Sequence, residues 1–205
     1  YYDRGRLPYA PGLADAMAEA LGLDGTGRLL DVGCGPGTVA LRFAHLFEAV
    51  VGVDADGDML TEGARIAAER EIANASWVRL LAEELPAGLG AFRVITFAAS
   101  FHWMDRGRVA RIVRGMLEPG GALVHVDNRH QVGVAPEAGL PHPPPPAEVS
   151  GLIARYLGPR RRAGLSFLDR SPDNEATVFR AVGFEGPDQV NVPDGRLLTR
   201  TMRAT

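Results

Sequence analysis

Three glycines fall within five positions in the stretch LLDVGCGPGTVALRFA (residues 29–44), between an apolar run and a helical pattern. A glycine-rich turn between a strand and a helix lets backbone N–H groups face a ligand at contact distance. In an open α/β sheet, ligands bind outside the carboxyl ends of the strands. The stretch therefore predicts a ligand at Gly33, Gly35 and Gly37.

Short apolar runs alternate with helical patterns along the first 128 residues. Unbroken apolar strands that alternate with helices are typical of a parallel sheet covered on both faces. The pattern therefore predicts a doubly wound α/β fold with three layers. The expected strands are residues 28–33, 49–54, 76–81, 93–98 and 122–127, and the expected helices are 12–22, 38–47, 56–72 and 105–117.

The texture changes after residue 128, where GLPHPPPPAEV (residues 139–149) reads as a stiff, extended connector. We expect helices over 147–157 and 171–183 and a closing hairpin over 188–201. The predicted organisation is a single domain over 1–205. It has a cofactor-binding core (1–128), a substrate-covering insertion (129–170) and a closing helix and hairpin (171–205).

Composition restricts the class of partner. A net charge of −3 provides no basic face for nucleic acid, and no apolar run approaches the ~20 residues that span a bilayer. The single cysteine, Cys34, excludes an internal disulfide, and the histidines lack metal-ligand spacing. No signal peptide is visible. We therefore expect a cytoplasmic protein with no metal, nucleic acid or membrane partner.

Two carboxylates around the glycines indicate the kind of ligand. The dinucleotide fingerprint G-x-G-x-x-G requires a third glycine where this chain has Thr38. Asp31 precedes the turn, which is unfavourable beside a pyrophosphate and suits a cation or an amino group. Asp54 ends the second strand, where a carboxylate can accept both hydroxyls of a ribose. The residues predict a ligand with a ribose and a positively charged portion.

At this point the sequence resembles the class I S-adenosylmethionine-dependent methyltransferases, type 11 branch. The likeness is carried in order by DVGCGPGT, VVGVDADGDML, AEELP, FAASFHWMD and MLEPGGALV, and it covers roughly residues 1–128. It implies a Rossmann-like, seven-stranded sheet whose last strand is antiparallel. It also implies S-adenosylmethionine as cofactor and S-adenosylhomocysteine as product.

The resemblance also implies roles for individual residues. The three glycines would cradle the cofactor, Asp31 would lie near its methionine amino group, and Asp54 would hold the ribose. Many relatives carry an aspartate where this chain has Leu81, so the adenine contact rests on its neighbours. The other residues implied at the cofactor are Arg6, Ala55, Met59, Ala82, Glu83 and Ala98, and Tyr9 is implied at the active-site lid.

The stretch SFHWMD (residues 100–105) follows the fourth strand, where the methyl acceptor is expected. His102 could act as a general base for a hydroxyl or amine acceptor, could line the pocket, or could have a structural role. Ser100 and Trp103 are candidates for substrate binding. Residues 160–162, RRR, are either a solvated loop or an attractor for an acidic substrate.

The sequence thus predicts methyl transfer from S-adenosylmethionine to a small molecule, most simply at oxygen. Two alternatives stay open: a nicotinamide-dependent oxidoreductase, and a non-catalytic protein that binds the cofactor.

Overall fold

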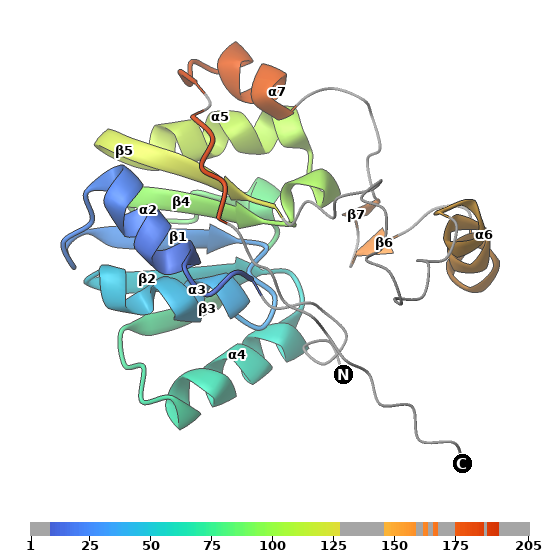
Figure 1. Ribbon diagram of the computed structural model, residues 1–205, viewed down its shortest axis with the longest axis horizontal. Coiled ribbons are helices and arrows are strands. Elements are labelled where there is room, and N and C mark those ends of the chain that lie inside the picture. Colours follow the sequence, from blue (N-terminus) through green and yellow to red (C-terminus); the bar gives the residue numbers. More distant parts are fainter. Residues whose placement is uncertain are drawn as a thin grey trace, which may run out of the picture.

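A computed structural model describes residues 9–127, 146–158, 162–163, 166–167, 175–186 and 188–192. Its centre is a sheet of five parallel strands in the order β3-β2-β1-β4-β5 (Figure 1). The order reverses direction at β1 and β4, which is where an open α/β sheet leaves a crevice for a ligand. The strands are β1 (Arg28–Val32), β2 (Ala49–Asp54), β3 (Ala75–Arg79), β4 (Phe92–Ala98) and β5 (Leu117–Val126).

Helices and short 3-10 turns connect these strands, so the alternation predicted from the sequence is confirmed. The glycine turn leads from β1 directly into α3, and the chain after β2 enters α4 through Asp56, whose side chain accepts from the N–H groups of Asp58 and Met59. The connecting elements are α2 (Leu13–Leu21), α3 (Thr38–Phe43), η1 (Ala44–Leu46), α4 (Gly57–Glu69), η2 (Ala82–Glu84), η3 (Phe101–Trp103) and α5 (Arg106–Met116).

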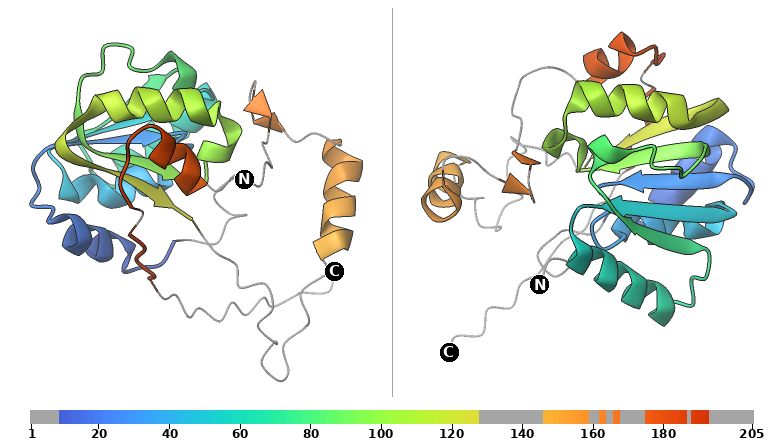
Figure 2. Two further views of the ribbon diagram at one scale, coloured as in Figure 1. Left: turned by 90° about the horizontal axis from the view of Figure 1, so that it is seen from above. Right: turned by 180° about the vertical axis from the view of Figure 1, so that it is seen from behind.

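Side-chain alternation along the strands divides the core into two layers. Leu30 and Val32 of β1 pack in the cluster that contains α5, whereas Leu29 packs with α2 and α3. All three side chains are completely buried, because both faces of the sheet are covered. Figure 2 shows the helices on the two sides of the strands. The three-layer arrangement is therefore the one that the apolar runs predict.

The antiparallel last strand is not found in the sheet of the described residues. The resemblance implied seven strands with an antiparallel last strand, but the sheet in the described residues has five strands, and all are parallel. Residues 188–192, the described part of the expected hairpin, form no strand. This short segment lies between Pro187 and Pro193 in the sequence, and neither proline has an N–H to donate to a ladder.

The elements after the sheet match the sequence expectations in part. α6 (Pro146–Leu157) begins one residue before the helix predicted over 147–157, and α7 (Glu175–Ala181) lies within the one predicted over 171–183, while residues 171–174 and 193–201 lie outside the described residues. A two-residue antiparallel ladder, β6 (Arg162–Ala163) with β7 (Ser166–Phe167), was not expected. The carboxyl ends of the sheet strands point to the side on which β6, β7 and α6 lie (Figure 1). None of the helices in the described residues has the length and apolarity needed to cross a membrane.

Candidate functional site

A cavity of about 840 Å³ opens at the carboxyl ends of the strands. Four segments that are far apart in the sequence meet there: the glycine turn, the end of β2 with the start of α4, η2, and the end of β4 with η3. Tyr9 closes one side of the cavity and is itself buried. The cavity thus lies where the sequence predicts a ligand.

The backbone of the glycine turn is occupied by the protein itself. The N–H groups of Gly33 and Cys34 both donate to the carbonyl oxygen of Val53, at 2.8 and 3.0 Å. Gly35 donates to the Asp54 carboxylate, Gly37 donates to Cys34, and position 36 is a proline without an N–H. The five residues of the turn therefore offer no free N–H to a phosphate, which is the group that glycine-rich turns of dinucleotide sites bind.

The glycines are required by close packing as well as by backbone conformation. Gly33 and Gly37 have φ of 68° and 75°, and Gly35 has φ of 54°. A Cβ on Gly37 would lie 2.2 Å from the ring of Trp77, and a Cβ on Gly33 would lie 2.6 Å from Cβ of Ser100. The sequence attributed these glycines to a ligand alone, whereas two of them face side chains of this chain.

Asp54 stands at the wall of the cavity with its carboxylate fixed in place. Its Oδ2 accepts from Gly35 N–H at 2.8 Å, and its Oδ1 accepts from Asp56 N–H at 2.9 Å. A carboxylate has about four lone-pair sites, so two acceptor positions remain. A ribose with two vicinal hydroxyls matches this donor and acceptor set, while a phosphate would meet repulsion.

Asp31 lies beneath the turn rather than in the cavity wall. It is completely buried, Thr96 Oγ1 donates to it at 2.7 Å, and Ala40 N–H donates to it at 3.2 Å. Burial raises the pKa of Asp31 to about 6, even though these two hydrogen bonds act in the opposite direction. Asp31 therefore ties β1 to β4 and to α3. Its predicted place near a methionine amino group stays a prediction.

Most of the other predicted residues meet in the same cavity. Tyr9 comes from the N-terminal side, where Arg42 of α3 donates to the carbonyl oxygen of Ala10 at 2.6 Å. Ser100 is buried, and its hydroxyl donates to the carbonyl oxygen of Val32 at 2.6 Å. Arg6 lies outside the described residues. The lining includes Ala55, Met59, Ala82, Glu83, Ala98, Ser100 and Trp103.

The chain after β4 turns sharply at the cavity. Ala99 has φ of 51°, a left-handed conformation that is uncommon for alanine, and its N–H donates to the carbonyl oxygen of Val126 at 3.2 Å. Ala98 and Ala99 both line the cavity, so small side chains face the ligand there. Backbone strain of this kind clusters at functional sites.

His102 is not among the residues that line the cavity within the described part of the chain. Its ring lies against Trp103, with the centroids 5.2 Å apart, and its charge acts on Glu175 of α7. Burial alone would raise the pKa of Glu175. The hydrogen bond from His125, at 2.6 Å, and the charges of His125, His102 and Arg106 outweigh burial and lower that pKa. The three roles that the sequence left open for His102 stay predictions.

Sequence reasoning missed Trp77, whose ring lies under the glycine turn. Its ring atoms lie within 3.0 Å of the Cβ positions of Gly37, Gly52 and Gly63. These glycines belong to three different elements: the turn, β2 and α4. Glycines in several neighbouring elements can indicate that one large side chain packs against all of them. The register that sets Gly52 opposite Trp77 is visible only in the folded sheet.

Comparison with known proteins adds a family to this geometry. Residues 29–121 match the family model described as a methyltransferase domain. The uncharacterized methyltransferase Rv0089 of Mycobacterium tuberculosis is 36% identical over 117 residues, which cover 55% of this chain and 56% of that protein. The ubiquinone biosynthesis O-methyltransferase of Caulobacter is 35% identical over 99 residues, covering 47% of this chain and 39% of that enzyme.

A solved structure shares the fold. The crystal structure of YcgJ from Bacillus subtilis aligns with a TM-score of 0.51 and 27% identity, covering 55% of this chain and 48% of YcgJ. The chain spans about half the length, 40% to 56%, of the first relatives that it matches. The parallel sheet, the glycine turn and the matched family agree with one another. These findings support a class I S-adenosylmethionine-dependent methyltransferase domain over the matched residues 29–121, with S-adenosylmethionine as cofactor and S-adenosylhomocysteine as product.

Proposed function

We propose that this protein transfers a methyl group from S-adenosylmethionine to a small molecule, most simply to an oxygen atom. The observation that carries the proposal is the glycine turn, whose N–H groups are occupied within the protein while Asp54 faces the cavity. This environment suits a ribose and a sulfonium, and it disfavours a phosphate.

Bound S-adenosylmethionine supplies an electrophilic methyl group, and the residues of this chain have to position it and its acceptor. Asp54 would hold the ribose, Ala82 would lie along the adenine, and Ala98 and Ala99 would leave room at the methionine portion. Holding donor and acceptor in near-attack geometry can supply about 7–11 kcal/mol of the barrier. His102 does not line the cavity in the described residues, so the proposal assigns it no proton transfer.

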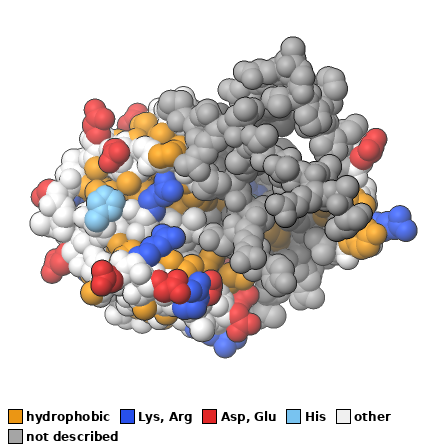
Figure 3. Space-filling model, turned by 60° about the horizontal axis from the view of Figure 1, so that its bottom comes forward, with side chains coloured by type: hydrophobic (Ala, Val, Ile, Leu, Met, Phe, Trp, Pro, Cys, Tyr) orange, Lys and Arg blue, Asp and Glu red, His pale blue; other side chains and the backbone are white. Residues whose placement is uncertain are grey.

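Three observations support a small molecule, and one supports oxygen. The site is a cavity at the strand ends, and the face drawn in Figure 3 mixes acidic and basic side chains instead of presenting a basic surface. The net charge of −3 is also unfavourable for nucleic acid. The name of the Caulobacter relative, a ubiquinone biosynthesis O-methyltransferase, supports an oxygen acceptor.

The nicotinamide-dependent alternative is disfavoured because the N–H groups of the glycine turn itself donate within the protein and not to a pyrophosphate. The alternative of a non-catalytic cofactor binder has the same pocket and differs only in turnover.

The experiment that tests the proposal is transfer of a tritiated methyl group from S-adenosylmethionine to a panel of small phenols, alcohols and carboxylates. Asp54→Ala, which removes the ribose acceptor, should abolish transfer at limiting cofactor. Asp24→Ala, at the opposite end of the sheet, serves as the control and should not affect transfer. Tight binding of S-adenosylhomocysteine without transfer to any acceptor would favour the non-catalytic binder.

A further inference from the structure

Two turns in the wall of the cavity, η2 and η3, are linked through one side chain. η2 contributes Ala82 to the adenine side, and Trp103 and Met104 line the side that follows β4. Glu83 Oε1 accepts from the N–H of Asp105 at 2.8 Å, across 22 positions in the sequence. Arg108 Nη2 adds a second link by donating to the carbonyl oxygen of Glu83 at 3.0 Å.

The donor at the far end of this link is the first residue of a helix cap. Asp105 is the N-cap of α5, and its own carboxylate accepts from Arg108 N–H at 3.0 Å. Asp105 immediately follows Met104, whose N–H closes the η3 turn by donating to Phe101 at 3.2 Å. Fixing the main chain at Asp105 therefore also fixes the end of η3, which is part of the cavity wall.

We propose that Glu83 is a positioning residue that holds η3 and Met104 at a set distance from the adenine side of the cavity. This inference rests on the proposed function, because that function puts the methyl acceptor against η3. The resemblance implied that Glu83 meets the adenine edge. In the structure its carboxylate oxygen instead accepts from the main-chain N–H of Asp105, which follows η3.

The chain provides a matched control one residue away. Glu84 belongs to the same turn, but its Oε2 accepts from Leu81 N–H at 2.6 Å and thus stabilises only η2. Glu83→Ala and Glu84→Ala both remove one carboxylate from η2, and only the first releases the part of the wall formed by η3. Glu83→Gln keeps an oxygen acceptor for Asp105 N–H and should restore the link.

Asp105→Pro removes the donor instead of the acceptor. Asp105 has φ of −67°, which proline adopts, and Met104 before it is extended with ψ of 163°. Asp105→Ala is the control for the lost cap, since it keeps the N–H. If the link is real, Glu83→Ala should not change the amide exchange of Trp103 and Met104 any further when Asp105→Pro is already present.

The test is amide hydrogen exchange of Trp103 and Met104 by NMR, together with calorimetric titration of S-adenosylhomocysteine. We expect Glu83→Ala to speed exchange of both amides at least threefold, with Glu84→Ala and Glu83→Gln close to the wild-type protein. The dissociation constant for S-adenosylhomocysteine should change less than threefold in Glu83→Ala.

Unchanged exchange in Glu83→Ala, or a Glu83→Gln variant that behaves like Glu83→Ala, would overturn the proposal. So would a tenfold loss of S-adenosylhomocysteine affinity with unchanged exchange, because that result makes Glu83 an adenine ligand. Failure of the wild-type protein to bind S-adenosylhomocysteine would count against the proposed function alone. The exchange comparison would still decide whether Glu83 holds the wall.

Discussion

Asp24 and Asp31 lie at opposite ends of the same sheet and have opposite environments. Asp24, at the amino ends of the strands, is exposed, and hydrogen bonds from Thr26 and Arg93 hold its pKa below the usual value. Asp31, at the carboxyl ends, is completely buried, its hydrogen-bond donors in the described residues are the neutral Thr96 hydroxyl and Ala40 N–H, and burial raises its pKa. The environment at the amino ends thus favours the ionised form of Asp24, whereas the environment at the carboxyl ends disfavours the ionised form of Asp31.

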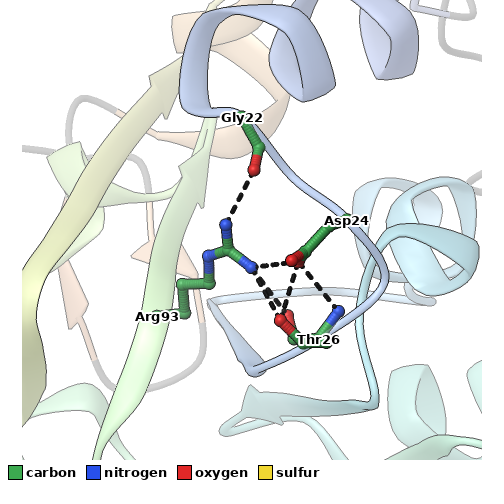
Figure 4. A network of polar contacts seen from close by, with 4 residues as sticks. All are labelled: Gly22, Asp24, Thr26 and Arg93. Atoms are coloured by element: carbon green, nitrogen blue, oxygen red, sulfur yellow. Dashed lines mark hydrogen bonds and ion pairs between the residues drawn. The ribbon is translucent and has the colours of Figure 1, made fainter.

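The rest of each end follows the same division. Arg93 of β4 donates from one nitrogen to the carbonyl oxygen of Gly22 at 2.8 Å and from the other to Thr26 Oγ1 at 2.9 Å and to Asp24 (Figure 4). Long side chains close the loops at this end. At the carboxyl ends, Ala99 and the three glycines of the turn, all with positive φ, line a cavity. The comparison teaches that side-chain hydrogen bonds close one end of the sheet, while the other end is left open for a ligand.

The largest effect is expected for Gly37→Ala. The new Cβ would require a left-handed alanine and would overlap Trp77, so we expect a loss of about 3–5 kcal/mol in the free energy of unfolding. Gly22→Ala is the control, because Gly22 also has positive φ but nothing lies within 4 Å of its Cβ position. It should cost about 1–2 kcal/mol. Equal losses in urea unfolding would show that Trp77 does not require the glycine.

The next largest effect is a pH dependence from Asp31. A carboxyl group whose pKa is raised in the folded state contributes stability that is complete below the unfolded pKa, 3.8, and is lost as the pH rises through about 6. We expect the free energy of unfolding of the wild-type protein to fall by about 3 kcal/mol relative to that of Asp31→Asn between pH 4 and pH 7. Urea unfolding of both proteins across this range measures the difference. A constant difference would contradict the assigned environment.

Asp24→Asn should show the opposite sign, which makes it the natural partner of that measurement. A carboxyl group with a lowered pKa contributes stability above its unfolded pKa, and this contribution is lost as the pH falls through the folded pKa. The free energy of unfolding of the wild-type protein should therefore rise relative to that of Asp24→Asn as the pH rises from 2 to 5. The same sign for both variants would remove the contrast between the two ends.

A smaller effect is expected for Arg93→Ala, about 1–2 kcal/mol, from lost hydrogen bonds to main-chain carbonyl oxygens. Because Arg93 lies at the amino end, the affinity for S-adenosylhomocysteine should not change. Arg93→Lys, which lacks the planar fork, should recover only part of the stability. A loss of cofactor affinity in Arg93→Ala would show that the two ends are coupled.

The five strands and the helices between them could be predicted from the sequence, because apolar runs and the glycines that end them are local signals. β5 was expected to start at residue 122, but it starts at Leu117, since EPGG is accommodated by an irregular register against β4 instead of ending the helix. A parallel neighbour overrode the turn preference of Pro and Gly. The antiparallel last strand came from the resemblance and not from the residues, and the sheet of the described residues does not contain it.

The position of the candidate site was predicted more successfully than the contacts of its individual side chains. Asp54, Met59 and Ala82 line the cavity, as the order of the motifs predicts. The side-chain partners of Glu83 and His102 could not be predicted, because they lie on η3, α5 and α7, and their contacts depend on how those elements pack. Local sequence fixes which strand end a residue follows, but not the direction of its side chain.

The central claim is that this cavity binds a nucleoside with a sulfonium through Asp54, without phosphate contacts. Calorimetric titration of S-adenosylhomocysteine and of NADH into the wild-type protein, Asp54→Ala and Asp24→Ala tests it most directly. We predict binding of S-adenosylhomocysteine to the wild-type protein and to Asp24→Ala, at least tenfold weaker binding to Asp54→Ala, and no binding of NADH. Binding of NADH alone, or equal affinity of Asp54→Ala and the wild-type protein for S-adenosylhomocysteine, would contradict the claim.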